Sequence, residues 1–222
     1  MVMFSFFASF KAEKNFIVES SELHQNIHKD YRLINAPSLS FEAYQQAIKG
    51  FRNLSKQNPQ IKKNLIGIVD FSKSSNQKRF YIIDLNQNKV LYHTLVAHGQ
   101  KSGEEFANYF SNIPESHQSS LGFYQTLNTY HGKHGLSLRL EGLEKCNDKA
   151  FDRAIVIHQA DYVSKEFIRK NGRLGRSFGC PALPSENYEE IIDLIKEGMC
   201  LFIYHPSPDY HASSEILKDS NI

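Results

Sequence analysis

Two residues of this 222-residue chain, His158 and Cys180, have the types and surroundings that suit nucleophilic chemistry. His158 follows an apolar run at residues 154–157, which predicts a buried strand with the imidazole at its end. Cys180 stands between Gly179 and Pro181, which interrupt regular structure and predict a loop. A thiolate is the nucleophilic form of cysteine, and a neighbouring imidazole can take the thiol proton. The pair therefore predicts cysteine catalysis if the fold brings both side chains within hydrogen-bond reach; a buried structural cysteine is the alternative.

The loop around Cys180 also has groups that suit a developing oxyanion. The backbone N–H groups of a tight turn can donate to such an oxygen, and Ser177, Phe178, Gly179 and Cys180 form a candidate turn. Gly179 allows close approach to a substrate carbonyl, and Pro181 lacks an N–H group and stiffens the end of the loop. The sequence therefore predicts that one loop supplies the nucleophile and the oxyanion donors.

Metal and phosphate chemistry have weaker support. His131 and His134 are three residues apart in a glycine-rich stretch, but the sequence places no further ligand group beside them. The three cysteines are too few and too scattered for a four-ligand zinc site or a disulfide framework, although a disulfide between Cys146 and Cys200 stays open. The glycine-rich residues 172–179 lead into Cys-Pro, whereas a phosphate loop leads into a helix. We therefore expect no metal and no other cofactor.

Composition excludes several classes of protein. Hydrophobic residues make up 41% of the chain and charged residues 23%, which argues against disorder and against a membrane-embedded body. The net charge of +2 is too small to predict nucleic-acid binding. No apolar run reaches the roughly 18 residues of a membrane-spanning helix. Residues 1–12 are apolar and are either part of a truncated signal peptide or a frayed terminus.

The remaining pattern predicts a β-rich domain. A helix is expected over residues 40–57, where apolar residues recur every three or four positions and Ser40 can cap. A second helix is expected over residues 185–198, and a short helical pattern lies around residues 163–170. Strands rich in branched and aromatic residues are expected at residues 65–71, 79–85, 89–97, 123–130, 136–140, 154–157 and 200–204. About eight short strands with few helices favour an α+β fold that is mainly β, a sandwich or barrel with peripheral helices.

The residues that suggested catalysis resemble a known family. His158, eighteen further residues and then Ser177-Phe178-Gly179-Cys180 resemble the signature of the L,D-transpeptidases of the YkuD fold, in which a histidine precedes a Ser/Thr-His-Gly-Cys box. Four segments in order are similar to the murein L,D-transpeptidase catalytic-domain branch: residues 119–124, 132–138, 152–158 and 175–183. The resemblance implies a YkuD-like catalytic domain at residues 60–206. Residues 1–59 would then be a lead-in with one helix, and residues 207–222 a loosely attached tail.

Two positions depart from the general pattern of that family. Phe178 stands where the wider family has the histidine of the box, and Pro181-Ala182 replaces a hydrophobic residue followed by Asn or Arg. The divergent branch is similar to this chain at both places, so we interpret them as features of the branch. They leave His158 as the base near the thiol. In relatives a backbone carbonyl orients this imidazole.

The resemblance implies an enzyme that acts on peptidoglycan stem tetrapeptides. Cys180 would release D-alanine through a thioester, with His158 as base, and an amine from a neighbouring stem would complete a 3-3 cross-link. If water accepts the acyl group, the enzyme is an L,D-carboxypeptidase. A cell-wall cysteine peptidase is less favoured, because papain-like enzymes place cysteine before histidine. A module that binds peptidoglycan without catalysis is a third alternative.

Other site residues are expected from the resemblance and from strand pattern. Ser177 would support the loop or the substrate, and Arg176 would bind a stem carboxylate or pair within the protein. His134, Arg139 and Phe178 are expected along a substrate groove, although a solvated face explains Arg139 equally well. The expected partners are peptidoglycan stem peptides, with no nucleic acid and no integral membrane segment. Export to the periplasm or cell wall fits such a substrate.

Overall fold

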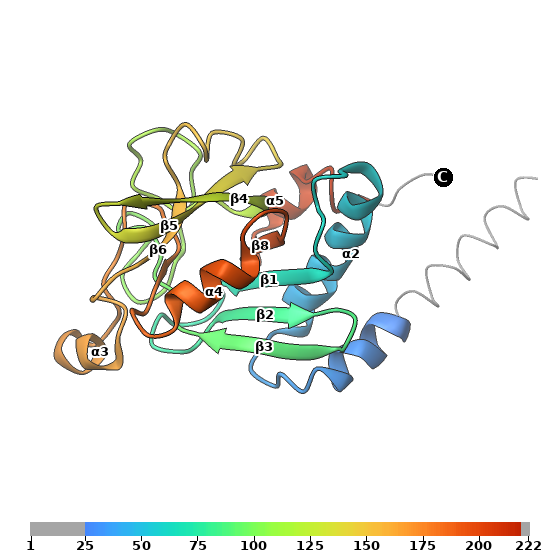
Figure 1. Ribbon diagram of the computed structural model, residues 1–222, viewed down its shortest axis with the longest axis horizontal. Helices are drawn as coiled ribbons and strands as arrows, with labels where there is room; N and C mark the ends of the chain where they lie inside the picture. Colours follow the sequence, from blue (N-terminus) through green and yellow to red (C-terminus); the bar gives the residue numbers. More distant parts are fainter. Residues whose placement is uncertain (1–24, 219–222) are drawn as a thin grey trace, which may run out of the picture.

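A mixed eight-stranded sheet forms the centre of the computed structural model, which describes residues 25–218 (Figure 1). The apolar start at residues 1–12 lies outside the described residues. The strand order is β3-β2-β1-β8-β4-β5-β6-β7, with parallel pairing of β1 with β8 and of β6 with β7. The strands are β1 (Leu65–Asp70), β2 (Phe80–Asp84), β3 (Lys89–Thr94), β4 (Gly122–Gly132), β5 (Gly135–Gly142), β6 (Val156–Gln159), β7 (Ala182–Leu183) and β8 (Cys200–Tyr204).

The two edges of the sheet approach each other and form a nearly closed barrel. Ala97, three residues beyond the end of β3, forms an antiparallel bridge with Ala182 of β7. Gly99 forms a second, parallel bridge with Ser177. Because Cys180 lies between these two bridged positions, the closure of the barrel and the placement of the thiol depend on the same contacts.

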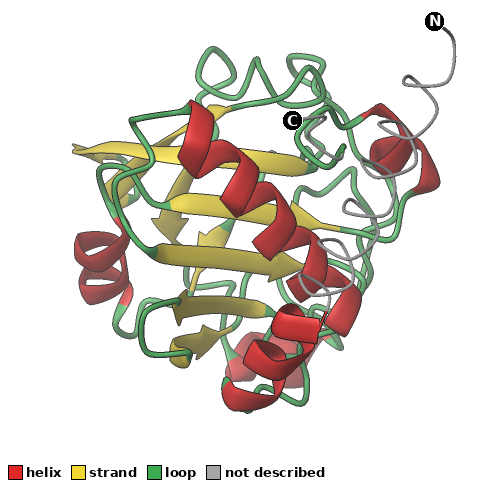
Figure 2. Ribbon diagram, turned by 90° about the vertical axis from the view of Figure 1, so that its right-hand side faces the viewer, coloured by secondary structure: helices red, strands yellow, loops and turns green. Residues whose placement is uncertain are grey.

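Helix α2 (Phe41–Gln57) lies across the sheet and packs on β1 and β8 (Figure 2). The spacing of apolar residues predicted this helix, and Ser40 is its N-cap, with Oγ accepting the N–H of Ala43. Tyr44 and Ile48 on its buried face belong to the main hydrophobic core together with strand residues. The division of the chain at residue 59 stays a prediction.

The remaining helices lie at the periphery of the barrel. Helix α3 (Lys165–Asn171) has no buried residue and projects from the body of the protein (Figure 1). Helix α4 (Tyr188–Ile195) contacts β5 and β6 and is shorter than the predicted residues 185–198. Its ends are set by left-handed backbone, with a φ of 59° at Asn187 and 61° at Glu197. Among the described residues, none of the helices has the length and apolarity needed to cross a membrane.

The end of the chain packs more closely than the sequence predicted. Helix α5 (Pro208–Ser213) buries Tyr210, whose hydroxyl donates to Glu144 Oε2 (2.9 Å). Ser214 also donates to the Glu144 carboxylate. The expectation of a loosely attached tail is therefore wrong for residues 208–214, because Glu144, far away in sequence, supplies the acceptors that hold them.

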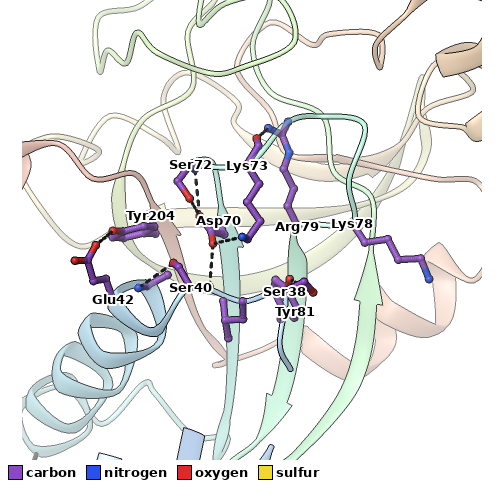
Figure 3. A network of polar contacts seen from close by, with 12 residues as sticks. Ser38, Ser40, Glu42, Asp70, Ser72, Lys73, Lys78, Arg79, Tyr81 and Tyr204 are labelled. Carbon is purple, nitrogen blue, oxygen red and sulfur yellow. Dashed lines mark hydrogen bonds and ion pairs between the residues drawn. The ribbon is translucent and has the colours of Figure 1, made fainter. Parts of the chain in front are cut away.

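A buried polar network joins the start of α2 to β1 (Figure 3). Asp70 at the end of β1 accepts the N–H of Ser40 (3.3 Å) and of Ser72 (3.2 Å), and Lys73 lies 3.8 Å away. Arg79 directly precedes β2, and its carbonyl oxygen accepts the N–H of Asp70. Its side chain is fully buried. The Asp70 carboxylate thus fixes the helix to the sheet.

Candidate active site

The cysteine loop, residues 176–182, is closed by the side chain of Ser177. Ser177 Oγ accepts the N–H of Gly179 (3.1 Å) and donates to the carbonyl of Cys180 (2.6 Å). Ser177 is buried, whereas Cys180 is partly exposed. One hydroxyl therefore holds the N–H group of Gly179 and the carbonyl group of Cys180, on either side of the thiol residue's own N–H group.

The backing segment, residues 95–100, holds the cysteine loop through main-chain hydrogen bonds. Ala97 N donates to Ala182 O (2.9 Å), and Ser177 N donates to His98 O (3.0 Å). Gln100 N donates to Ser177 O (2.8 Å). A small apolar cluster packs beneath both segments: Leu95, Ala97, Ala160, Val163, Leu174 and Ala182. The loop is thus anchored on both sides of Cys180.

Gly179 occupies a position that other residues fit poorly. Its φ is +126°, and a Cβ there would lie 2.8 Å from the carbonyl oxygen of Gln118 and 3.0 Å from Ile155 Cδ1. Its carbonyl accepts the hydroxyl of Ser119 (3.0 Å), and Ser119 Oγ in turn accepts the N–H of Gly99 (3.0 Å). The structure therefore gives a reason for glycine here that the sequence did not supply, since Gln118 and Ser119 come from a distant loop.

We expect Gly179→Ala to destabilise the protein by about 1–3 kcal/mol through backbone strain, and to lower activity by roughly 100-fold through displacement of the thiol. Gly172→Ala is the matched control, because Gly172 also has a positive φ of +75° but no atom within 4 Å of the added Cβ. Chemical denaturation and rates of Cys180 acylation measure the two effects. Equal activity losses in both variants would contradict the conclusion that the close contacts around Gly179 place the thiol.

The thiol of Cys180 lies against the start of β6. Its Sγ accepts the N–H of Val156 (3.5 Å) and lies 3.7 Å from the carbonyl oxygen of Ala154, to which S–H donates. His158 lies in β6, two residues after Val156, and pairs with Ala182 of β7. Its imidazole is therefore two strand positions beyond the Val156 N–H group that contacts the thiol. Two residues of strand span roughly 6.6 Å. The fold thus places Cys180 in the loop two residues before β7 and His158 in the neighbouring strand β6, although 21 residues separate them in sequence.

A carbonyl group sets the tautomer of His158. Nδ1 lies 2.8 Å from the carbonyl oxygen of Gln159, and because that oxygen only accepts, Nδ1 carries the proton. In the neutral ring Nε2 then has the free lone pair and is the atom that can take a proton. The ring stacks on that of His134, with centroids 4.5 Å apart. His134, predicted in the groove, therefore lies directly beside the predicted base.

The electrostatic surroundings favour a neutral resting pair. Burial raises the pKa of the Cys180 thiol, and the Val156 N–H and the charges of Arg153 and Lys133 oppose this shift. Burial lowers the pKa of His158, and the charges of His134 and Lys133 add to that effect. The thiol and the imidazole are therefore both neutral near pH 7. Proton transfer then accompanies nucleophilic attack.

Lys133 lies in the turn between β4 and β5 and acts on both groups. Its charge disfavours the imidazolium, so we expect Lys133→Gln to raise the pKa of His158. The base then becomes protonated at higher pH, and the acid limb of the pH profile of kcat/KM moves to higher pH. Lys89→Gln, at an exposed position on β3, is the control. An acid limb that stays in place or moves to lower pH would refute this role.

Arg153 is a site residue that the sequence did not single out. Its Nη1 donates to Ser111 O (2.8 Å) and Ser120 Oγ (2.7 Å), and its Nη2 donates to Gln118 O (2.7 Å). A Cβ on Gly179 would lie 3.3 Å from Nη2, so the guanidinium stands behind the cysteine loop. Its charge lowers the pKa of Cys180 against the effect of burial. In the sequence, its position five residues before His158 was the feature that could have indicated a place near the site.

Two of the four expected oxyanion donors are already engaged. Ser177 N donates to His98 O, and Gly179 N donates to Ser177 Oγ. The N–H groups of Phe178 and Cys180 are therefore the ones to consider for a substrate oxygen. The predicted oxyanion donors are thus reduced from four N–H groups to these two.

The other predicted substrate residues lie around the loop in different settings. Arg176 Nη1 donates to Glu104 Oε1 (2.7 Å) and to two carbonyl oxygens, which supports pairing within the protein. Phe178 is 62% exposed and stacks on His117 with centroids 4.5 Å apart. The guanidinium of Arg139 lies 4.2 Å from the centre of the Tyr130 ring. Substrate binding by these residues stays a prediction.

Comparison with known proteins defines the family. Residues 35–204 match the family model of the L,D-transpeptidase catalytic domain. The chain therefore belongs to the L,D-transpeptidase catalytic domain family, which is a family of enzymes, as the resemblance of its motifs predicted. Its mainly β fold with peripheral helices was also predicted correctly. No curated protein is significantly similar to the chain.

Several solved structures are similar to the chain at low sequence identity. An L,D-transpeptidase from Mycobacterium smegmatis is 13% identical, with a TM-score of 0.41 over 64% of this chain and 59% of that one. L,D-transpeptidase 3 from Mycobacterium tuberculosis is 11% identical, with a TM-score of 0.42 over 64% and 61%. An L,D-transpeptidase from Enterococcus faecium is 11% identical, with a TM-score of 0.40 over 64% and 50%. This chain thus spans 50–61% of the length of these structures.

Proposed function

We propose that the protein is a cysteine-dependent L,D-transpeptidase that acts on the stem tetrapeptides of peptidoglycan. Membership of the family supports the reaction class. The observation that carries the proposal is the position of Cys180 in the loop that leads into β7, beside strand β6 with His158, whose imidazole has Nε2 free to take a proton. The hydrogen bonds that hold the loop around the thiol add support, since acyl transfer depends on a precisely held nucleophile.

In the first half of the reaction, Cys180 cleaves the bond between the third residue and the terminal D-alanine. The sulfur bonds to the carbonyl carbon of the diaminopimelate-like residue while the thiol proton passes to Nε2 of His158. The oxyanion is stabilised by the N–H groups of Phe178 and Cys180. The C–N bond then breaks, and His158 returns its proton to the leaving nitrogen. D-alanine departs, and a thioester remains on Cys180.

In the second half, an amine from a neighbouring stem accepts the acyl group. The amine nitrogen bonds to the thioester carbon, His158 takes the proton that it loses, and the C–S bond breaks. The sulfur recovers the proton from His158, which restores the resting pair. The product is a 3-3 cross-link. Water in place of the amine gives a trimmed tripeptide, which is the L,D-carboxypeptidase alternative.

Such a substrate lies outside the cytoplasmic membrane, so we further propose that the protein is exported and acts in the periplasm or cell wall. Fractionation of cells tests this location. Recovery of the unprocessed protein in the cytosol alone would contradict it.

The activity is tested by incubating the full chain with purified disaccharide-tetrapeptide muropeptides and separating the products by mass spectrometry. A cross-linked dimer that has lost one D-alanine is the expected product. Conversion to disaccharide-tripeptide alone would assign the carboxypeptidase activity. A wild-type enzyme that binds the muropeptide and releases no D-alanine would refute both activities.

A further inference from the structure

Arg79 is a fully buried cation whose hydrogen bonds go mostly to the backing segment. Its Nε and Nη2 both donate to Val96 O (3.1 and 3.0 Å), and its Nη2 also donates to His98 Nδ1 (2.8 Å). Its Nη1 donates to Lys73 O (2.8 Å). Figure 3 shows its guanidinium beside the Lys73 backbone, while the Asp70 carboxylate is directed to Ser72 and Lys73. These four bonds thus go to carbonyl oxygens and an imidazole rather than to a carboxylate.

The contacts of His98 fix it as a neutral ring. Nδ1 faces a guanidinium, which only donates, so Nδ1 is the acceptor. Nε2 lies 3.3 Å from the carbonyl oxygen of Gly103 and is therefore the protonated nitrogen. Burial, together with the charge of Arg79, lowers the pKa of His98 to about 3. The imidazole is thus a permanent link between the guanidinium and the loop at Gly103.

The backing segment, to which these side chains bond, in turn anchors the cysteine loop through main-chain hydrogen bonds. Val96 and His98, which bond to Arg79, flank Ala97, which bonds to Ala182 on one side of Cys180. The carbonyl of His98 itself accepts the N–H of Ser177 on the other side. A shift of Val96 to His98 would therefore move both anchors of the loop together.

We propose that Arg79 and His98 form a buried positioning pair that sets the place of the Cys180 thiol. The pair acts through the backing segment and touches no reacting atom. A correctly placed thiol keeps the N–H of Val156 and the nearby charge of Arg153, both of which favour the thiolate. The proposal rests on the proposed function only in taking Cys180 as the nucleophile.

Burying a charged guanidinium in the core costs desolvation free energy, and filling the space does not require a charged side chain. Burial lowers the pKa of Arg79 to about 9, so the side chain stays charged at neutral pH although it is desolvated. An apolar residue of similar volume would fill the same space without that cost. The directional bonds to Val96 and His98 are what such a residue cannot supply.

Three substitutions of His98 distinguish its hydrogen bond with Arg79 from its hydrogen bond with the Gly103 carbonyl. In His98→Asn the amide oxygen stands near the place of Nδ1 and can accept from Arg79. In His98→Gln the amide nitrogen stands near the place of Nε2 and can donate to Gly103, but the contact with Arg79 is lost. His98→Phe keeps the ring shape and loses both bonds. All three are uncharged, as His98 is.

The readout is the rate of Cys180 alkylation by iodoacetamide as a function of pH, assigned by peptide mass on protein shown to be folded by circular dichroism. We expect His98→Phe and His98→Gln to move the alkylation curve to higher pH and to slow the reaction at pH 7 by roughly tenfold. His98→Asn should follow the wild type. Arg79→Lys should slow alkylation in a wild-type background and add little in His98→Phe, because the two residues act as a unit.

A role limited to stability would lower the melting temperature and leave the alkylation curve in place, which would overturn the proposal. Slow alkylation of Cys180 in His98→Asn, together with fast alkylation in His98→Gln, would also overturn the proposal. The bond to Arg79 would then have no effect on the thiol. The alkylation series does not need the peptide substrate. A wild type that turns over no muropeptide but gives the expected series would support the positioning pair while refuting the proposed transpeptidase activity.

Discussion

Replacing Cys180 by alanine is expected to abolish D-alanine release and cross-linking, with a loss of roughly 10⁴-fold or more that reaches the limit of detection. The nucleophile is the atom that holds the acyl group, and no neighbouring side chain can take its place. The same substitution should remove the covalent adduct with a carbapenem, seen as a mass increase of the intact wild-type protein. Both measurements use the full chain.

The two other cysteines are matched controls. Cys200 is fully buried in β8, and burial raises the pKa of its thiol. Cys146 donates to the carbonyl of Leu121, and burial raises its pKa to about 12. Cys146→Ala and Cys200→Ala should therefore keep the adduct and the activity. An adduct that survives in Cys180→Ala would assign the nucleophile elsewhere and would contradict the role proposed for the cysteine loop.

Replacing His158 by alanine is expected to lower kcat by about 10²–10⁴-fold, because the thiol then has no positioned base. The unprotonated Nε2 of the wild-type ring and the raised pKa of Cys180 together make the reaction depend on this group. Steady-state rates with a muropeptide donor measure the effect. Alkylation of Cys180 at high pH should survive, since a chemically formed thiolate needs no base.

His134 provides a direct control for this second prediction. Its ring stacks on His158 with centroids 4.5 Å apart, so the two imidazoles share one neighbourhood. His134→Ala removes the ring stacked on the base but leaves the bond from His158 Nδ1 to Gln159 intact. It should keep most of kcat. If His134→Ala loses more activity than His158→Ala, the roles of the two residues are reversed.

The elements that the sequence predicted well are those whose signal is local. Strand β8 coincides with the apolar residues 200–204, which follow the turn at Gly198. Helix α2 begins and ends within one residue of its predicted range because Ser40 caps it and its apolar face is periodic. The packing of residues 208–214 was missed, because it depends on Glu144, which nothing near Tyr210 in the sequence indicates.

The same distinction applies to the active site. Cys180 and His158 carry their chemistry in their residue types and stand in a recognisable order, so the sequence was sufficient to propose them. Arg153, Ser119 and His98 form hydrogen bonds to segments distant in sequence; Ser119 and Gly179, for example, are 60 positions apart. Those contacts exist only once the barrel closes.

Cys180 is proposed to carry the acyl group during turnover, and this covalent intermediate can be trapped. Wild-type enzyme is mixed with a tetrapeptide muropeptide, quenched in acid within the first turnover and digested for mass spectrometry. The peptide containing Cys180 is expected to gain the mass of the donor after loss of D-alanine, with no such gain in Cys180→Ala. Turnover without any covalent species, or a gain of mass on a peptide that contains Cys146 or Cys200, would contradict it.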